Sequence, residues 1–86
     1  MKAVHSIYDQ AIDITEEYLG PAAKRFLDRQ ISAHLNKDPE LLSRADLGKL
    51  MDWLEASVAL LTDDQIIVNE FCAKLKKLSK GPDGAQ

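Results

Sequence analysis

Residues 43–65, SRADLGKLMDWLEASVALLTDDQ, contain the longest helical pattern of the chain and the signals that start and end it. Apolar residues recur there every three to four positions, the spacing of one face of an α-helix. This stripe consists of Leu47, Leu50, Met51, Leu54, Val58 and Leu61. Ser43 and Asp46 have the spacing of a capping box, in which two side chains satisfy free amides at a helix start. We predict a helix that begins after Ser43 and buries this stripe.

Helical periodicity extends outward from this stretch in both directions. A first helix is predicted over about residues 3–19, and Gly20 and Pro21 suit the end of one helix and the start of the next. A second helix follows from Pro21 to about residue 35, and a short helical turn is expected over residues 39–42. A further capping pattern, Thr62-x-x-Gln65, predicts the start of a last helix that runs to Lys80.

These segments together predict an all-α fold. No segment alternates between apolar and polar residues over the length of a strand, so a sheet is not expected. The predicted architecture is a small bundle of four main helices plus one short helical turn, and both an up-and-down and an orthogonal arrangement remain open. Residues 1–80 are expected to form a single domain, and residues 81–86, GPDGAQ, a disordered tail.

Composition and charge restrict the classes of partner. The 86 residues carry a net charge of -3, which disfavours nucleic acid and anionic lipid as partners of the whole molecule. No apolar stretch approaches the roughly 20 residues that cross a bilayer, so no membrane segment is expected. The lone Cys72 has no second cysteine for a disulfide, which is compatible with a reducing compartment. We predict a cytoplasmic protein.

Catalytic and metal-binding patterns are weak. His5 and Asp9 are four positions apart, but a stable metal site needs three or four ligands. His34 lies on the apolar stripe of the second helix, where we expect a partly buried, hydrogen-bonded ring instead of a catalytic base. Cys72, between Phe71 and Ala73, is expected to be a small buried apolar residue. We therefore predict a non-enzymatic chain with no cofactor, no metal and no small-molecule substrate.

A second apolar line runs along the helix of residues 43–65. Trp53, Ala56 and Leu60 follow the spacing i, i+3, i+7 well away from the main stripe. This helix is either packed on both sides in the centre of the bundle, the interpretation that we favour, or it binds a partner. If it binds, these three residues are the predicted contact residues, because tryptophan is enriched among the residues that dominate binding energy.

A basic face on the second helix offers an alternative. Lys24, Arg25 and Arg29, extended by the lysines near the C-terminus, could bind phosphate groups of nucleic acid or an acidic partner. No aromatic residue lies between these charges, as a single-strand binder would prefer. We therefore expect a solvated face here and keep nucleic-acid binding as the alternative function.

Residues 18–27, YLGPAAKRFL, show a family resemblance. The segment resembles the Tyr-Ile-Gly-Pro-Ile-Ala-Lys type of sequence in a small helical module near the ends of bacterial signalling proteins, including some serine/threonine kinases and response regulators. Ala22 stands where that pattern has a larger aliphatic residue. The resemblance implies an accessory or interaction role in a bacterium and transfers no functional residues. The leading expectation is an interaction or regulatory module that binds a protein partner or associates with itself as a homodimer.

Overall fold

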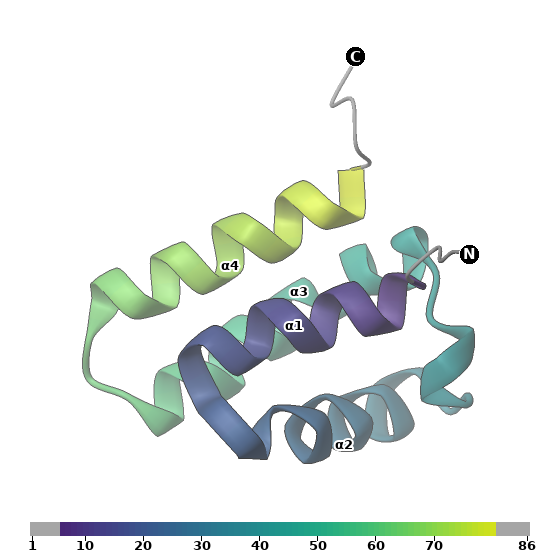
Figure 1. Ribbon diagram of the computed structural model, residues 1–86, viewed down its shortest axis with the longest axis horizontal. Coiled ribbons are helices and arrows are strands. Elements are labelled where there is room, and N and C mark those ends of the chain that lie inside the picture. The colour runs from purple at the N-terminus through teal and green to yellow at the C-terminus, as the bar shows by residue number, and fades with distance from the viewer. Residues whose placement is uncertain (1–5, 81–86) are drawn as a thin grey trace.

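A computed structural model describes residues 6–80 (Figure 1). The α-helices are α1 (Ile7–Leu19), α2 (Ala23–Leu35), α3 (Arg44–Leu61) and α4 (Gln65–Lys80). Two 3-10 helices, η1 (Gly20–Ala22) and η2 (Pro39–Leu41), lie in the connections, where the sequence predicts only one helical turn. No strand occurs within residues 6–80, so the all-α prediction is confirmed. The predicted tail over residues 81–86 lies outside the described residues, and the single domain over residues 1–80 stays a prediction.

The helices follow one another in alternating directions, which is the up-and-down arrangement (Figure 1). α1 packs against α2 and α4, and α3 packs against the same two helices. α2 and α4 therefore lie on opposite sides of the molecule, as Figure 1 shows. This arrangement follows from the short connections, because a chain that turns within a few residues places the next helix antiparallel to the previous one.

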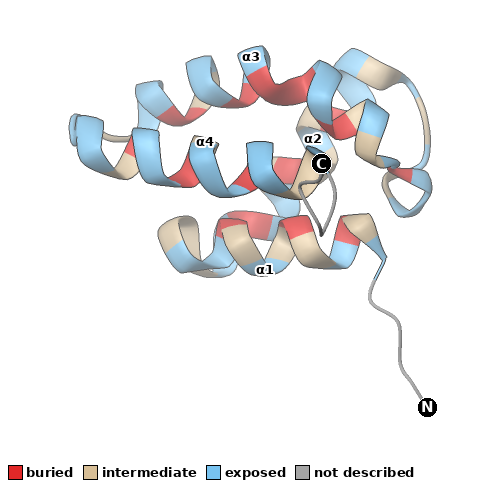
Figure 2. Ribbon diagram, turned by 90° about the horizontal axis from the view of Figure 1, so that it is seen from above, coloured by how far each residue is buried: buried red, intermediate tan, exposed pale blue. Residues whose placement is uncertain are grey.

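A single cluster of buried side chains fills the space between the helices (Figure 2). Its members are Tyr8, Ala11, Leu27, Ile31, Leu42, Leu47, Leu50, Met51, Leu54, Val58, Val68, Phe71 and Leu75. The stripe predicted for α3 is buried from Leu47 to Val58. Its last member, Leu61, is instead 60% exposed, because α3 ends at this residue and the chain leaves the bundle for the loop to α4.

Two predicted helix starts are wrong, and local capping explains both. α1 begins at Ile7 instead of about residue 3, because Ser6 has an extended backbone and its hydroxyl accepts a hydrogen bond from the Asp9 amide at 3.0 Å. α2 begins at Ala23 instead of Pro21. Gly20, with a φ of 63°, ends α1, and Pro21 lies in the 3-10 turn that follows.

α4 begins at Gln65, slightly later than a helix capped by Thr62 would begin, because its cap differs. The predicted capping box between Thr62 and Gln65 does not form. The carboxylate of Asp64 accepts a hydrogen bond from the Ile66 amide at 3.0 Å, and the Gln65 side chain donates to Asn69. Asp64 stands closer to the first turn than Thr62 does, so its charged acceptor takes the free amide and also favours the positive end of the helix dipole.

The predicted capping box at the start of α3 forms. The Ser43 hydroxyl accepts a hydrogen bond from the Asp46 amide at 3.1 Å, and the Asp46 carboxylate accepts one from the Ser43 amide at 3.2 Å. The Lys37 ammonium group lies 2.5 Å from the same carboxylate. The hydrogen bond from Lys37 is the main reason why the pKa of Asp46 lies below its usual value of 3.8.

Asp46→Asn is expected to lower the free energy of unfolding by about 1 kcal/mol at pH 7, because the substitution removes the charge that Lys37 and the Ser43 amide stabilise. Asp46 stabilises the fold fully above its unfolded pKa of 3.8, and this contribution is lost as the pH falls through its lower pKa in the folded protein. Urea unfolding of both proteins from pH 7 to pH 2 should show the difference shrinking below pH 3.8. A difference that grows in acid would contradict this account.

Candidate protein-binding surface

The second apolar line of α3 lies on the outside of the molecule. Trp53 is 46% exposed, Leu60 is 88% exposed, and Ala56 between them is also exposed. The interpretation that α3 is packed on both sides inside the bundle is therefore wrong. α2 and α4 both contact α3, and the buried stripe of α3 belongs to the core cluster, whereas Ala56 and Leu60 on the second line are exposed.

Trp53 is held in place by His34 of α2. The two rings are stacked, with centroids 4.4 Å apart and an angle of 17° between their planes. His34 is exposed, and within residues 6–80 it forms no hydrogen bond, so the predicted partly buried, hydrogen-bonded ring is wrong. α2 and α3 bring the two rings together because they run antiparallel, which places the end of α2 beside the middle of α3.

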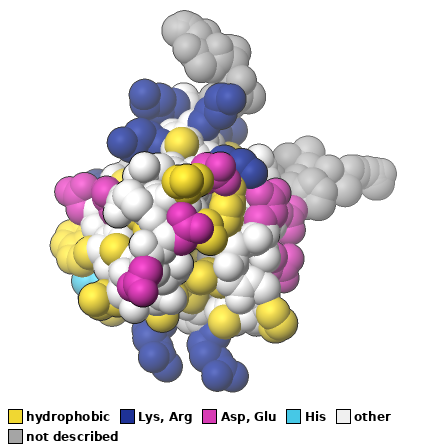
Figure 3. Space-filling model, turned by 90° about the vertical axis from the view of Figure 1, so that its left-hand side faces the viewer, with side chains coloured by type: hydrophobic (Ala, Val, Ile, Leu, Met, Phe, Trp, Pro, Cys, Tyr) yellow, Lys and Arg dark blue, Asp and Glu magenta, His cyan; other side chains and the backbone are white. Residues whose placement is uncertain are grey.

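A separate groove lies toward the other end of α2. It has a volume of about 370 Å³ and lies between α2, the turn before it and the end of α3. Its lining residues are Leu19, Ala22, Arg25, Phe26, Arg29, Gln30 and Leu61. We call the groove and the adjacent exposed line together the α2/α3 surface, which comprises the lining residues and His34, Trp53, Ala56 and Leu60. Figure 3 shows apolar side chains on the side of the molecule where the cyan histidine atoms lie.

Sequence reasoning missed that Phe26, Gln30 and Leu61 line a groove. Leu61 was predicted to belong to the buried stripe, but it is exposed, and Phe26, on helical spacing in α2, is only half-buried. Gln30 was not singled out. The sequence did contain a signal for Gln30. Phe26, Gln30 and His34 follow the spacing i, i+4, i+8, so they lie along one side of α2, and Gln30 is the polar residue in the middle of that line.

Gln30 carries an unsatisfied polar group. Its side-chain oxygen is buried and has no hydrogen-bond partner among the described residues. Burying an amide oxygen without a partner costs about 1–3 kcal/mol. Gln30 therefore lowers the stability of the free domain. An apolar side chain at this position would avoid the cost.

Gln30→Met is expected to raise the free energy of unfolding by about 1 kcal/mol, because methionine has a similar length and buries no polar oxygen. Thermal or urea unfolding measures the change. Gln65→Met, at an exposed position of α4, is the matched control and should change the free energy of unfolding by less than about 0.5 kcal/mol. Destabilisation by Gln30→Met alone would show that the amide has a partner in solution.

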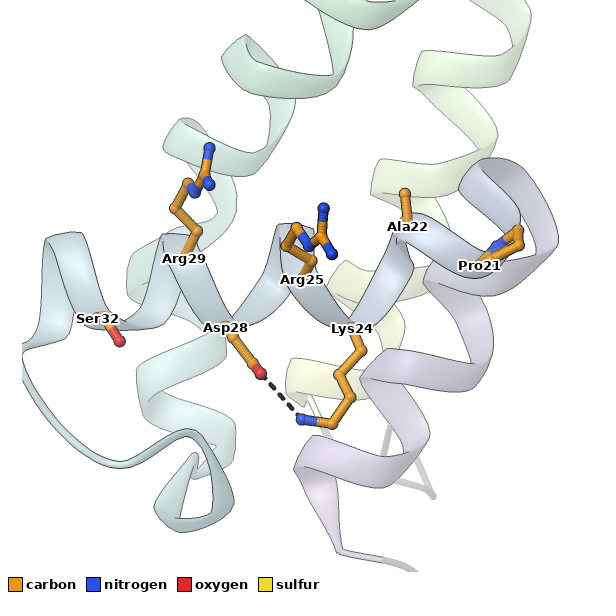
Figure 4. Close-up of a pocket in the computed structure, with 7 residues that line it drawn as sticks. All are labelled: Pro21, Ala22, Lys24, Arg25, Asp28, Arg29 and Ser32. Atoms are coloured by element: carbon orange, nitrogen blue, oxygen red, sulfur yellow. Dashed lines mark hydrogen bonds and ion pairs between the residues drawn. The ribbon is translucent and has the colours of Figure 1, made fainter.

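Lys24, Arg25 and Arg29 of the predicted basic face line one open pocket together with Asp28, but their side chains point in different directions (Figure 4). Lys24 points to one side of α2, where its ammonium group lies 3.0 Å from Asp28 and 5.8 Å from the centre of the Tyr8 ring. Tyr8 also donates a hydrogen bond to Asp28. The hydrogen bond with Asp28 is the main reason why the pKa of Lys24 is raised. Arg25 and Arg29 point to the other side of α2 and form no ion pair within residues 6–80.

The expected extension of this face by the C-terminal lysines is wrong. Figure 3 shows basic side chains at two opposite ends of the view, those of α4 at the top and those of α2 at the bottom. Lys74 of α4 pairs with Glu17 at 2.6 Å, and this hydrogen bond raises the pKa of Lys74. A continuous basic patch for a phosphate backbone is therefore not formed by the described residues of these two helices.

The other candidate groups do not converge on a reaction centre. No cluster of three potential metal ligands occurs in the part of the chain that the structure describes, and His5 lies outside it. Cys72 is half-buried, and burial is the main cause of its raised pKa, with the negative charge of Glu55 adding to it. A raised pKa keeps the thiol protonated and weakens it as a nucleophile.

Among the described helices, none is both long and apolar enough to span a bilayer. The resemblance of residues 18–27 to a module of bacterial signalling proteins stays a prediction. The chain matches no protein-family model, no curated protein and no solved structure.

Proposed function

We propose that this chain is a small, non-enzymatic protein-interaction module that binds a protein partner through the α2/α3 surface. The exposure of Trp53, Leu60 and Leu61 on one helix, with Leu61 lining an apolar groove, is the observation that carries the proposal. Exposed apolar side chains scattered singly are normal, but a contiguous patch next to an apolar groove is typical of an interaction site. Trp53 is the predicted centre of the interface, because it offers a large apolar area that His34 already holds in one orientation.

As its cellular role, we propose that the chain is an adaptor or regulator of another protein. A short chain without an assembled reaction centre in its described part is suited to act by binding, as an adaptor or regulator of another protein. The resemblance of residues 18–27 supports a role beside bacterial signalling proteins in the cytoplasm. Self-association through the same surface would make a homodimer, and it is one of the outcomes of the test below.

A photo-crosslinking amino acid at position 60 tests the proposal. Leu60 is 88% exposed, so the replacement should leave the fold intact. The same group at Lys76, exposed on α4, is the matched control. We expect position 60 to capture a defined protein in the cells that express the chain, with capture lost in a Trp53→Ala background. Capture of a second copy would identify a homodimer, and equal products from both positions would contradict the proposal.

A further inference from the structure

The α2/α3 surface is long enough to contact about two turns of a bound helix. His34 and Trp53 lie at one end, and Phe26 and Leu61 lie at the other. Eight residues separate the two ends on each helix, which at 1.5 Å per residue corresponds to about 12 Å, or slightly more than two helical turns. A partner helix that presents apolar residues at i, i+3, i+4 and i+7 covers this length with one side.

The charges on the two walls of the groove differ. Arg25 and Arg29 lie on the α2 wall, one turn apart, and neither has an ion-pair partner in residues 6–80. Lys24 on the same helix is already neutralised by Asp28, which leaves the two guanidinium groups as the charges available to a ligand. None of the groove-lining residues is acidic. Arginine binds carboxylates with two parallel hydrogen bonds, so this wall is complementary to acidic side chains.

This charge pattern also argues against a second copy as the occupant. In a symmetric dimer the same surface meets itself, so both copies would bring Arg25 and Arg29 into one interface. The groove would then contain four guanidinium groups and no acidic lining residue to pair with them. Like charges in one interface oppose association, whereas a partner with carboxylates on the facing side gains both attraction and a faster encounter.

We propose that the α2/α3 surface binds an acidic amphipathic helix of a protein partner. The apolar side of this helix covers Trp53, Leu60 and Leu61, and carboxylates along its flank pair with Arg25 and Arg29. This inference rests on the proposed function and adds the chemical class of the partner to it. Gln30 also lines the groove, and a polar side chain of the partner can satisfy its buried oxygen once the amide turns toward the groove.

A set of designed peptides tests the inference. The first carries leucine at i, i+3, i+4 and i+7 with glutamate along one flank, and the second has lysine in place of every glutamate. A third keeps the acidic sequence but has a central proline, which breaks the helix. Each is titrated into the folded chain up to about 1 mM, with Trp53 fluorescence and calorimetry as readouts. We expect the acidic helix to bind at least about tenfold more tightly than either counterpart.

Charge reversal on α2 provides the matched comparison. Arg25→Glu/Arg29→Glu should weaken binding of the acidic helix about tenfold and reverse the preference between the acidic and the basic peptide. Lys76→Glu/Lys77→Glu makes the same charge change on α4, on the opposite side of the molecule, and should change binding less than about twofold. Circular dichroism checks that both variants keep their helices.

The outcomes separate this inference from the proposed function. If the basic peptide or the proline peptide binds as tightly as the acidic helix, the inference that the partner is an acidic helix is wrong. The proposal of an apolar interaction surface would then still stand. Absence of binding by the acidic helix would also overturn the inference, and the crosslink at position 60 then judges the proposed function alone. An oligonucleotide that binds through Arg25 and Arg29 more tightly than the acidic helix would replace the protein partner by nucleic acid.

Discussion

Replacing Phe71 with alanine is expected to lower the free energy of unfolding by about 3–5 kcal/mol. Phe71 is fully buried and is the largest of the fully buried side chains. Its ring lies 5.8 Å from that of Tyr18 in an edge-to-face arrangement, and it belongs to α4, which packs against both α1 and α3. A small domain is stable by only about 5–15 kcal/mol, so this single cavity removes a large part of its stability.

Urea unfolding followed by circular dichroism measures this loss. The matched control is Ile66→Ala on the same helix. Ile66 is 67% exposed, so its truncation removes little buried apolar surface. We expect the control to change the free energy of unfolding by less than about 0.5 kcal/mol. Similar losses for the two variants would mean that α4 does not present Phe71 to the core, and the helix arrangement described above would be wrong.

Replacing Trp53 with alanine is expected to separate binding from folding. About half of the side chain is exposed, and its main contact is the stacked ring of His34. We expect the free energy of unfolding to fall by about 1–2 kcal/mol, well below the cost of emptying a fully buried site. The affinity for the partner captured at position 60 should fall at least about tenfold, because a central tryptophan carries a large share of interface energy.

Leu54→Ala is the matched control for this prediction. Leu54 follows Trp53 directly in α3 but is fully buried, so its truncation should cost about 2–5 kcal/mol of stability. Affinity measured on the fraction that remains folded should be almost unchanged. If Trp53→Ala unfolds the chain as strongly as Leu54→Ala does, Trp53 belongs to the core, and the binding surface must lie elsewhere.

The core of the bundle could be predicted from the sequence, whereas the helix ends could only partly be predicted. Leu47, Leu54 and Val58 are buried as their spacing indicates, because a helix with one apolar side lowers its free energy by turning that side inward. Helix ends depend on which of several nearby acceptors reaches a free amide. α1 begins at Ile7, later than the periodicity suggested, because Ser6 caps it, and Asp64 took the capping position expected for Thr62.

The candidate surface could be predicted only in part. The spacing of Trp53, Ala56 and Leu60 identifies a second apolar side of α3, but a spacing along one helix does not say which other helix covers that side. That depends on where α2 and α4 pack along α3, which is a property of the whole bundle. The pairing of Lys24 with Asp28 divided the basic face for a similar reason, since Tyr8 of α1 fixes the carboxylate in place.

Trp53 fluorescence tests the central claim most directly, because the chain contains one tryptophan. The claim is that the second apolar side of α3 faces solvent in the free monomer and stays available to a partner. We predict that acrylamide quenches Trp53 in the native monomer and that the bound acidic helix protects the indole from quenching. A blue-shifted emission that acrylamide reaches only after denaturation, in a chain shown to be monomeric, would contradict the claim.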